Sequence, residues 1–214
     1  MTGLFVTFEG VEGAGKTTQV ARLRDALERD GYCVTVTREP GGDTLAEGVR
    51  ALLLCGDVTP RAELLLFLAA RAQNTERIIR PCLAQGHIVL CDRFIDSSVA
   101  YQGVARGLGR DVVARLNAFA TAHLTPDITF LLDLPPEQGL LRIRQEQHDR
   151  IEAEGLDFHI RVREGFLAEA QKNSHRFRIL DANLPPDALH REILQHVYRV
   201  ATGRHLRRRE ESEI

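Results

Sequence analysis

The segment from Leu4 to Asp30 limits the fold of this chain more than any other part of the sequence. It begins with a short run of residues that favour a strand and continues through the loop Gly10-Val-Glu-Gly-Ala-Gly-Lys-Thr17. A helical pattern follows, with apolar residues at Val20, Leu23 and Leu27. The loop matches G-x-x-x-x-G-K-[ST], whose backbone N–H groups surround phosphate oxygens at a helix amino terminus. The sequence therefore predicts an α/β sheet that binds a nucleotide at the end of its first strand.

The side chains of this loop divide into two groups by expected role. The ammonium of Lys16 is expected to bridge the β- and γ-phosphates of ATP, and the hydroxyl of Thr17 to bind Mg²⁺. Glu12 is expected to point away from ATP, because a carboxylate repels a neighbouring anion. It either faces the hydroxyl groups of a second substrate or lies in solvent. The expected ATP-binding residues are Gly10, Val11, Glu12, Gly13, Ala14, Gly15, Lys16, Thr17 and Thr18.

Segments of strand-like and helix-like pattern alternate along the rest of the chain. This alternation predicts a P-loop NTPase-type doubly wound parallel sheet with helices on both faces. At 214 residues, one domain accounts for the whole chain. Further strands are expected at residues 32–37, 87–91, 128–134 and 177–180, a single P-loop kinase domain at 1–203 with a short mobile lid at about 142–154, and a solvated, charged C-terminal tail at 204–214.

Two helical segments are expected between the second and third strands. In the first, Leu45, Val49, Leu52 and Leu53 are predicted to share one apolar face. The second runs from about residue 61 to 85, and Pro81 is expected to kink or break it.

Composition excludes several other classes of protein. The chain is 43% hydrophobic and 27% charged with a formal net charge of -2, which is not typical of a nucleic-acid-binding protein. No apolar run approaches the length of a membrane span, and no signal peptide fits before the first strand, so a cytoplasmic protein is expected. The four cysteines have no spacing that would hold zinc, and we expect them to be reduced.

Charged residues follow the second and third expected strands. Asp92 and Arg93 come directly after a buried strand, and Arg38 follows the strand before it. Carboxyl ends of parallel strands form the edge of the sheet where ligands bind. Asp92 is expected to bind Mg²⁺, directly or through water, and the two arginines to hold an acceptor phosphate. The alternative is an ion pair that only caps the sheet.

Aromatic and polar side chains near the same edge offer a surface for a nucleobase. Phe67 and Arg71 lie four residues apart on one helical face, where a ring can stack on a base and a guanidinium can donate to it. Tyr101 and Gln102 offer a second ring and an amide. The alternative for each ring is an ordinary place in the core.

Several of these motifs recur in a fixed order along the chain. They are Phe8-Glu-Gly-Val-Glu-Gly-Ala-Gly-Lys-Thr-Thr18, Thr37-Arg-Glu-Pro-Gly-Gly42, Phe67 with Arg71, Asp92-Arg93, Ala100-Tyr-Gln-Gly103, Pro126-Asp127 and Asp149-Arg-Ile-Glu152. Together they resemble the thymidylate kinase family, over nearly the whole chain. The resemblance implies transfer of the γ-phosphate of ATP to dTMP, giving dTDP and ADP, with Mg²⁺ as cofactor. It also implies a homodimer.

The resemblance assigns a role to each residue of the acceptor site. Arg38 and Arg93 would hold the phosphate of dTMP, and Glu12 would lie near its sugar. Phe67 would stack on thymine and Arg71 would donate to a thymine carbonyl. The remaining polar edge of the base would meet Gln102, with Ser98 nearby, while Tyr101 would occupy the space of a ribose 2′-hydroxyl.

The family has one version with an arginine in the phosphate loop and another with arginines in the lid, and this chain resembles the second. Candidates for the catalytic arginine are Arg142, Arg144 and Arg150, with Arg150 the first choice. Two other functions stay open on the residues: a different nucleoside or nucleotide kinase, and a nucleotide-dependent switch protein. The absence of an N-K-x-D motif argues against the switch.

Overall fold

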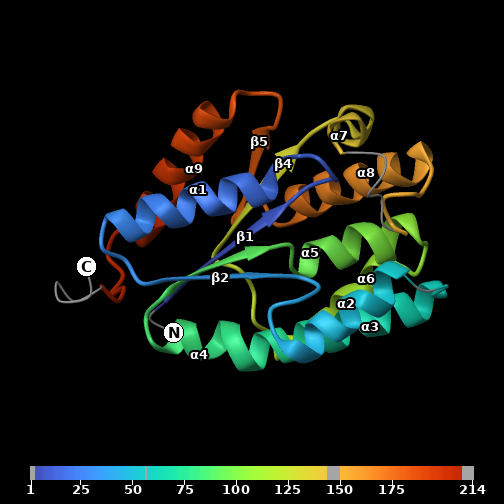
Figure 1. Cartoon of the computed structure of the whole chain (residues 1–214), viewed down its shortest axis with the longest axis horizontal. Helices are drawn as coiled ribbons and strands as arrows, with labels where there is room; N and C mark the ends of the chain where they lie inside the picture. Colours follow the sequence, from blue (N-terminus) through green and yellow to red (C-terminus); the bar gives the residue numbers. More distant parts are fainter. Residues whose placement is uncertain (1–2, 56, 144–149, 209–214) are drawn as a thin grey trace.

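Five parallel strands form one sheet in the described part of the chain, in the order β2-β3-β1-β4-β5 (Figure 1). The computed structural model describes residues 3–55, 57–143 and 150–208. The parallel sheet confirms the predicted doubly wound class, and every strand lies within two residues of its expected bounds. The strands are β1 (Leu4–Glu9), β2 (Val34–Arg38), β3 (Ile88–Asp92), β4 (Ile128–Asp133) and β5 (Phe177–Asp181).

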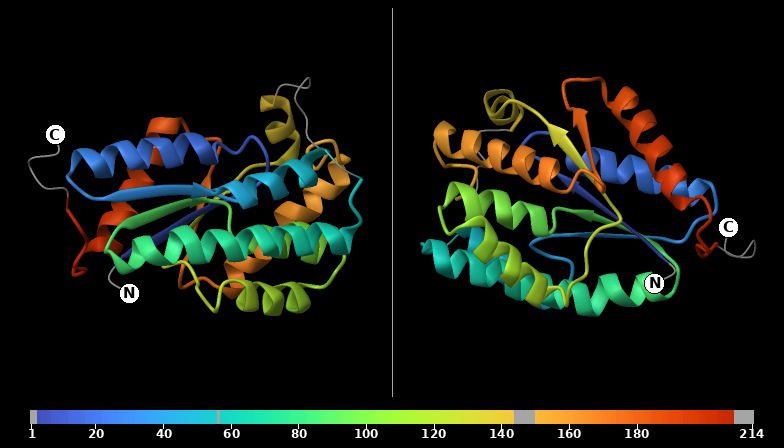
Figure 2. Two further views of the ribbon diagram at one scale, coloured as in Figure 1. Left: turned by 60° about the horizontal axis from the view of Figure 1, so that its bottom comes forward. Right: turned by 180° about the vertical axis from the view of Figure 1, so that it is seen from behind.

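Helices cover both faces of this sheet, and Figure 2 shows α1 and α4 on opposite sides of the strands. Alternate residues of β1 explain the two faces: Val6 packs with Leu23 of α1, whereas Phe5 packs with Leu83 of α4. The helices are α1 (Lys16–Arg29), α2 (Thr44–Cys55), α3 (Pro60–Asn74), α4 (Arg80–Ala84), α5 (Ile95–Ser98), α6 (Arg110–Ala120), α7 (Pro136–Arg142), α8 (Leu156–Lys172) and α9 (Pro186–Ala201). Two π-helical segments, η1 (Thr75–Ile79) and η2 (Val99–Ala105), continue α3 and α5. None of the helices in the described ranges has the length and hydropathy needed to cross a membrane.

The apolar face predicted for α2 was too wide. Leu53 is fully buried, together with Ala46 seven residues earlier, whereas Leu45 and Leu52 are 52% and 59% exposed. Residues seven apart lie on nearly the same side of a helix, whereas adjacent residues are rotated by about 100° around its axis. Ala46 and Leu53 therefore lie on the buried side of α2, and Leu45 and Leu52 lie outside it.

Of the two outcomes expected at Pro81, a kink or a break, the break does not occur. Helical structure continues from Pro60 to Ala84, and the irregular part is the π-helical turn η1, which lies just before Pro81. A proline ring meets the carbonyl four residues earlier, here that of Arg77. Because Arg77 lies within the wider turn, the chain passes the proline without ending the helix.

The register of the sheet brings the expected site residues to one edge. Phe8 of β1 pairs with Asp92 of β3, and Asp92 pairs in turn with Arg38 of β2. The phosphate loop leaves β1 at this same level. β2 and β3 lie on one side of β1, and β4 and β5 lie on the other, so the chain changes direction across the sheet at β1. Ligands bind at such switch points of open parallel sheets.

The first part of the C-terminal tail is not frayed, contrary to the expectation for residues 204–214. Arg204 donates two hydrogen bonds to the carboxylate of Asp127, and the backbone of Arg207 bonds to Gly86 and Cys33. The Arg208 guanidinium lies 3.6 Å from the centre of the Tyr32 ring. Residues 204–208 are therefore part of the domain, because they bond to segments that lie just before β2, β3 and β4. Residues 209–214 lie outside the described residues.

Deleting residues 204–214 should lower the free energy of unfolding by about 2 kcal/mol. The loss combines a few hydrogen bonds worth about 1 kcal/mol each with a partly exposed ion pair of smaller value. Urea unfolding followed by circular dichroism would measure it. A chain that ends at Arg208 keeps all of these contacts and serves as the control. Equal stability of the two shortened chains would contradict the prediction.

Candidate active site

A cavity of about 640 Å³ opens at the carboxyl edge of the sheet. The phosphate loop forms one side, the ends of β2 and β3 form the floor, and α3 and η2 form the opposite side. All of the residues expected to bind the acceptor line this cavity: Glu12, Arg38, Phe67, Arg71, Arg93, Ser98, Tyr101 and Gln102. The structure thus brings together residues spread over 91 positions of the sequence, from Glu12 to Gln102.

Lys16 lies buried over the backbone of the phosphate loop. Its Nζ donates hydrogen bonds to the carbonyls of Gly10 at 3.0 Å and Val11 at 2.8 Å. Burial, helped by the positive charge of Arg93, lowers the pKa of Lys16 to about 8, although neighbouring carboxylates act in the opposite direction. Phosphate oxygens in the cavity would stabilise the charged form of this side chain.

The phosphate loop rests directly on α7. A Cβ atom built on Gly139 would lie 2.2 Å from the carbonyl oxygen of Glu12, and one on Gly13 would lie 2.2 Å from that of Gly139. No side chain fits between these backbones, so both positions require glycine. The sequence analysis missed Gly139. The available signal was a glycine inside an otherwise helical segment, which often marks a close approach.

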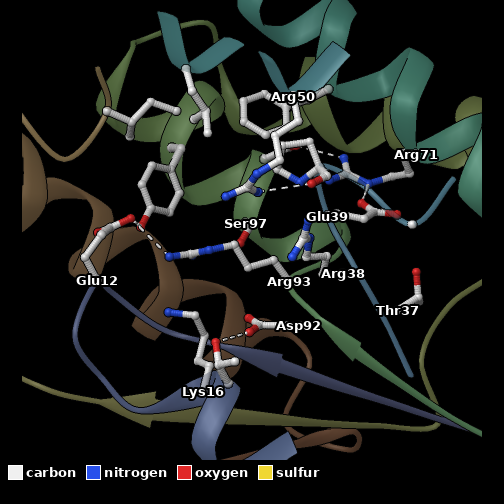
Figure 3. Close-up of a pocket in the computed structure, with 18 of the residues that line it drawn as sticks. Glu12, Lys16, Thr37, Arg38, Glu39, Arg50, Arg71, Asp92, Arg93 and Ser97 are labelled. Atoms are coloured by element: carbon white, nitrogen blue, oxygen red, sulfur yellow. Dashed lines mark hydrogen bonds and ion pairs between the residues drawn. The ribbon is translucent and has the colours of Figure 1, made fainter. Parts of the chain in front are cut away.

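The Glu12 side chain faces Arg93 and Tyr101 (Figure 3). Its carboxylate accepts hydrogen bonds from Arg93 at 3.0 Å and from the Tyr101 hydroxyl, and the Nδ1 of His159 lies 3.4 Å away. Burial raises the pKa of Glu12, but Arg93 and its other partners outweigh it and hold that pKa far below its ordinary range. The side chain is 10% exposed, which contradicts the solvated alternative.

The Arg93 guanidinium joins the phosphate loop to Tyr101 of η2 (Figure 3). It donates to the Gly10 carbonyl at 3.0 Å and to Glu12, and it lies 5.2 Å from the centre of the Tyr101 ring. Burial disfavours its charge, yet Glu12, Asp92 and the Tyr101 hydroxyl keep its pKa above the ordinary value. The group is therefore a fixed positive charge at the point where two phosphates could meet.

A buried glutamate holds the turn that carries Arg93. Arg93 has a positive φ of 70°, an unfavourable conformation for a side chain of this size. Glu9 accepts hydrogen bonds from the Phe94 N–H at 2.8 Å and the Ser97 hydroxyl at 2.6 Å, and so fixes the residues that follow. Burial, helped by Asp96, raises the pKa of Glu9 to about 7. Sequence reasoning missed this support, because nothing in the motif indicates where Glu9 points.

Thr17 and Asp92 supply the oxygens expected to bind magnesium. The Thr17 hydroxyl donates to Asp92 Oδ2 at 2.7 Å. Hydroxyl and carboxylate oxygens suit Mg²⁺, which takes few protein ligands and several from phosphates and water. No group of three or more His, Cys, Asp or Glu residues within the described ranges could hold a metal alone. The two residues therefore fit a metal that arrives with a nucleotide.

Two further arginines border the cavity near the end of β2. Arg38 forms an ion pair with Glu47 at 3.0 Å and is 56% exposed, so its guanidinium is accessible to a ligand. Arg50 donates to the Pro40 carbonyl at 3.1 Å and also lines the cavity. Sequence analysis missed Arg50, because its place on α2 gave no reason to prefer it to other surface arginines.

Arg71 is fixed by an unusually complete set of partners. Its Nε donates to Glu39 at 2.7 Å, its Nη1 to Ser98 and Asn117, and its Nη2 to the Phe94 carbonyl. A guanidinium has five N–H groups, so one on Nη2 is left for a ligand. This geometry is compatible with donation to a base carbonyl. Phe67 is half-buried and lines the same cavity.

The lid arginines are not arranged as expected. Arg150, the first choice for the catalytic arginine, donates to Glu63 and to the Leu53 carbonyl and does not line the cavity. The buried carboxylate of Glu63 is a strong partner for a guanidinium, which explains this placement. Arg142 instead lies beside the phosphate loop, 3.4 Å from the Gly13 carbonyl. Arg144 lies outside the described residues.

Comparison with known proteins identifies the family. The model of the thymidylate kinase family matches residues 8–193. The chain is 49% identical to a thymidylate kinase of Geobacter sulfurreducens over 85% of its own length and 90% of the relative. It is 50% identical to that of Deinococcus radiodurans, over 89% and 94% of the two chains.

The chain belongs to the thymidylate kinase family. A crystal structure of thymidylate kinase from Ehrlichia chaffeensis agrees in fold, with a TM-score of 0.76 and 35% identity. The match covers 92% of this chain and all of the other. The resemblance inferred from the motifs is therefore confirmed, and the switch-protein alternative is excluded.

Proposed function

We propose that this chain is the kinase that transfers the γ-phosphate of ATP to dTMP, giving dTDP and ADP in nucleotide biosynthesis. Family membership supports the activity. The observation that carries the substrate assignment is that one cavity is lined by Arg93, next to the phosphate loop, and by Phe67 and Arg71 of α3. An acceptor phosphate would lie at Arg93 and a pyrimidine ring at α3.

The proposed mechanism depends on position and charge rather than on a general base. Lys16 and the loop N–H groups hold the donor phosphates, and Arg93 and Arg38 hold the acceptor phosphate in line with them. Glu12 holds Arg93 in place and lies on the side of the acceptor sugar. Mg²⁺ would neutralise charge on the transferring group. Tyr101, held against Glu12 and Arg93, would occupy the space of a ribose 2′-hydroxyl and so favour a deoxyribose.

A lid arginine completes the charge around the transferring group, since the phosphate loop contains no arginine. Arg142 now becomes the first candidate, because its guanidinium lies beside Gly13. Arg150 remains a candidate only if the lid takes a different position when substrates bind, because its guanidinium is held by Glu63 and Leu53. Arg144 also stays a candidate, as it lies outside the described residues.

The decisive experiment is ADP formation measured with dTMP, dUMP, dCMP and thymidine as acceptors. We expect dTMP to have the highest kcat/KM. A clear preference for a nucleoside, or for another monophosphate, would favour the other kinase of this fold. The homodimer implied by the family would be measured by light scattering. We place the enzyme in the cytoplasm, where ATP and nucleoside monophosphates are found.

Replacing Asp92 by asparagine should raise the Mg²⁺ concentration needed for half-maximal activity by about tenfold. The amide keeps an oxygen for the Thr17 hydroxyl but removes the negative charge that attracts the cation. Activity measured over a range of Mg²⁺ at saturating ATP would show the shift. Asp43, a partly buried carboxylate just before α2 that does not line the cavity, gives the control Asp43→Asn, which should leave the Mg²⁺ requirement unchanged. Equal requirements in all three proteins would remove Asp92 from the metal site.

A further inference from the structure

Glu63 is a buried carboxylate that the mechanism above does not use. It lies in the first turn of α3, and its side chain is 1% exposed. Four hydrogen bonds reach it from three side chains: Gln102 Nε2 at 2.8 Å, Arg106 Nε at 3.3 Å, Arg106 Nη2 at 3.2 Å and Arg150 Nη2. With donors on both oxygens, Glu63 acts only as an acceptor.

This carboxylate fixes the orientation of the Gln102 amide. The side chain of Gln102 is buried, so turning it over would place its carbonyl oxygen against the Glu63 carboxylate. Two facing acceptors repel each other, and the buried amide nitrogen would lose its partner. Gln102 therefore keeps its nitrogen toward Glu63. The Oε1 of Gln102 makes no hydrogen bond to the rest of the described chain, and Gln102 lines the cavity.

A fixed amide distinguishes between pyrimidines. Thymine has an N–H donor at N3 and a carbonyl acceptor next to it. The Oε1 of Gln102 can accept from N3–H, and its amide N–H can donate to the carbonyl. Cytosine has an acceptor at N3 and an amino group at C4, so it would oppose the Oε1 of Gln102 with a lone pair. A site that hydrogen-bonds the donor and acceptor pattern of thymine rejects cytosine, because buried polar groups of the site would then be left without partners.

We propose that Glu63 is a positioning residue for base specificity: by fixing the amide of Gln102, it makes the cavity accept thymine and reject cytosine. The inference rests on the proposed function and deepens it. Glu63 touches no substrate, and its effect passes entirely through Gln102. Arg71 also lines the cavity but makes no hydrogen bond to Gln102 or Glu63, so the loss of Glu63 relaxes the selectivity without abolishing it.

The test is the ratio of kcat/KM for dTMP to that for dCMP in Glu63→Gln. A glutamine at position 63 offers either an oxygen or a nitrogen, so Gln102 can turn and meet the N3 acceptor of cytosine. We expect the ratio to fall about tenfold or more, with the dCMP value rising. In a Gln102→Ala background the same substitution should leave the ratio unchanged, because residues that act through one another are not additive.

Matched variants separate this effect from a loss of structure. Arg106→Gln removes a charged partner of Glu63 but leaves the hydrogen bond to Gln102, so its ratio should equal that of the wild type. Glu63→Asp keeps the negative charge but shortens the side chain by one methylene, which weakens its hold on Gln102, so it should relax the ratio too, even where the glutamine variant is too unstable to measure.

An unchanged ratio in Glu63→Gln or Glu63→Asp, or a proportional loss with both substrates, would overturn the inference and leave the proposed function intact. An equal change of the ratio in the Gln102→Ala background would also overturn it. Failure of the wild-type enzyme to prefer dTMP is a separate result, and it would instead remove the proposed function.

Discussion

Replacing Arg93 by alanine should lower kcat/KM for dTMP by roughly 10³-fold while ATP binding is retained. Arg93 supplies a fixed charge between the phosphate loop and the acceptor side, and an alanine leaves both phosphates without it. Removal of a single preorganised donor from a transition state costs about 10²- to 10³-fold. Steady-state kinetics with varied dTMP, together with calorimetric titration of ATP, would separate the two effects.

The same substitution should also destabilise the protein, because it leaves the Glu12 carboxylate buried without its main partner. Breaking a buried pair from one side costs about 3 kcal/mol. The double variant Arg93→Ala with Glu12→Gln removes that charge, so it should recover stability without recovering activity. Arg93→Lys keeps a charge but not the planar fork and should regain only part of the activity. Near-normal turnover of Arg93→Ala at saturating dTMP would exclude Arg93 from the acceptor site.

The pH dependence of stability provides a separate check on this pair. In the folded protein the pKa of Glu12 is held far below its ordinary value of 4.5. A carboxylate of this kind contributes stability above pH 4.5, and the contribution is lost as the pH falls toward the folded-state pKa. The difference in Tm between wild type and Arg93→Ala should therefore be largest near neutral pH and become smaller below about pH 4.5.

The edge of the sheet where the site lies could be predicted because the carboxyl ends of all strands in a parallel sheet lie at the same edge. Once the phosphate loop placed the end of the first strand, Asp92 and Arg38 had to lie beside it, and the register confirms this arrangement. The residues at that edge were identified from their position after apolar strands. Their roles toward ATP and dTMP remain predictions.

The contacts that support the site could not be predicted, because each depends on how distant elements pack. Glu9 caps the turn after Arg93, and Gly139 meets the phosphate loop across 126 positions of sequence from Gly13. Arg150 was chosen from its motif, and it binds Glu63 because α3 places a buried carboxylate within reach. Charge and spacing indicate that a side chain needs a partner, but only the packing of the helices selects which one.

Replacing Lys16 by methionine should lower kcat by roughly 10³-fold without lowering the melting temperature. The methionine keeps most of the apolar volume but cannot carry charge to the β- and γ-phosphates, where the transition state needs it most. In the folded protein the pKa of Lys16 is about 8, against an ordinary value of 10.5. The charged form is therefore disfavoured by folding, and it reduces stability at every pH below about 8.

The sign of this linkage gives two measurements beyond activity. Wild-type stability should rise as the pH increases from about 8 to 10.5, because the unfolded state then binds the additional proton, and Lys16→Met should lack that rise. ATP should draw a proton onto Lys16, so calorimetric titrations near pH 8.5 in two buffers of different ionisation enthalpy should show proton uptake in the wild type but not in Lys16→Met.

Lys172, the one other lysine of the chain, is an exposed residue at the end of α8, and Lys172→Met is the matched control. It should keep both the proton uptake and normal turnover. If Lys16→Met melts well below the wild type, the two hydrogen bonds from Nζ to the loop carbonyls stabilise the protein more than the burial of the charge destabilises it. The loop would then depend on Lys16 for its shape as well as for its charge, and the activity loss alone would not separate the two.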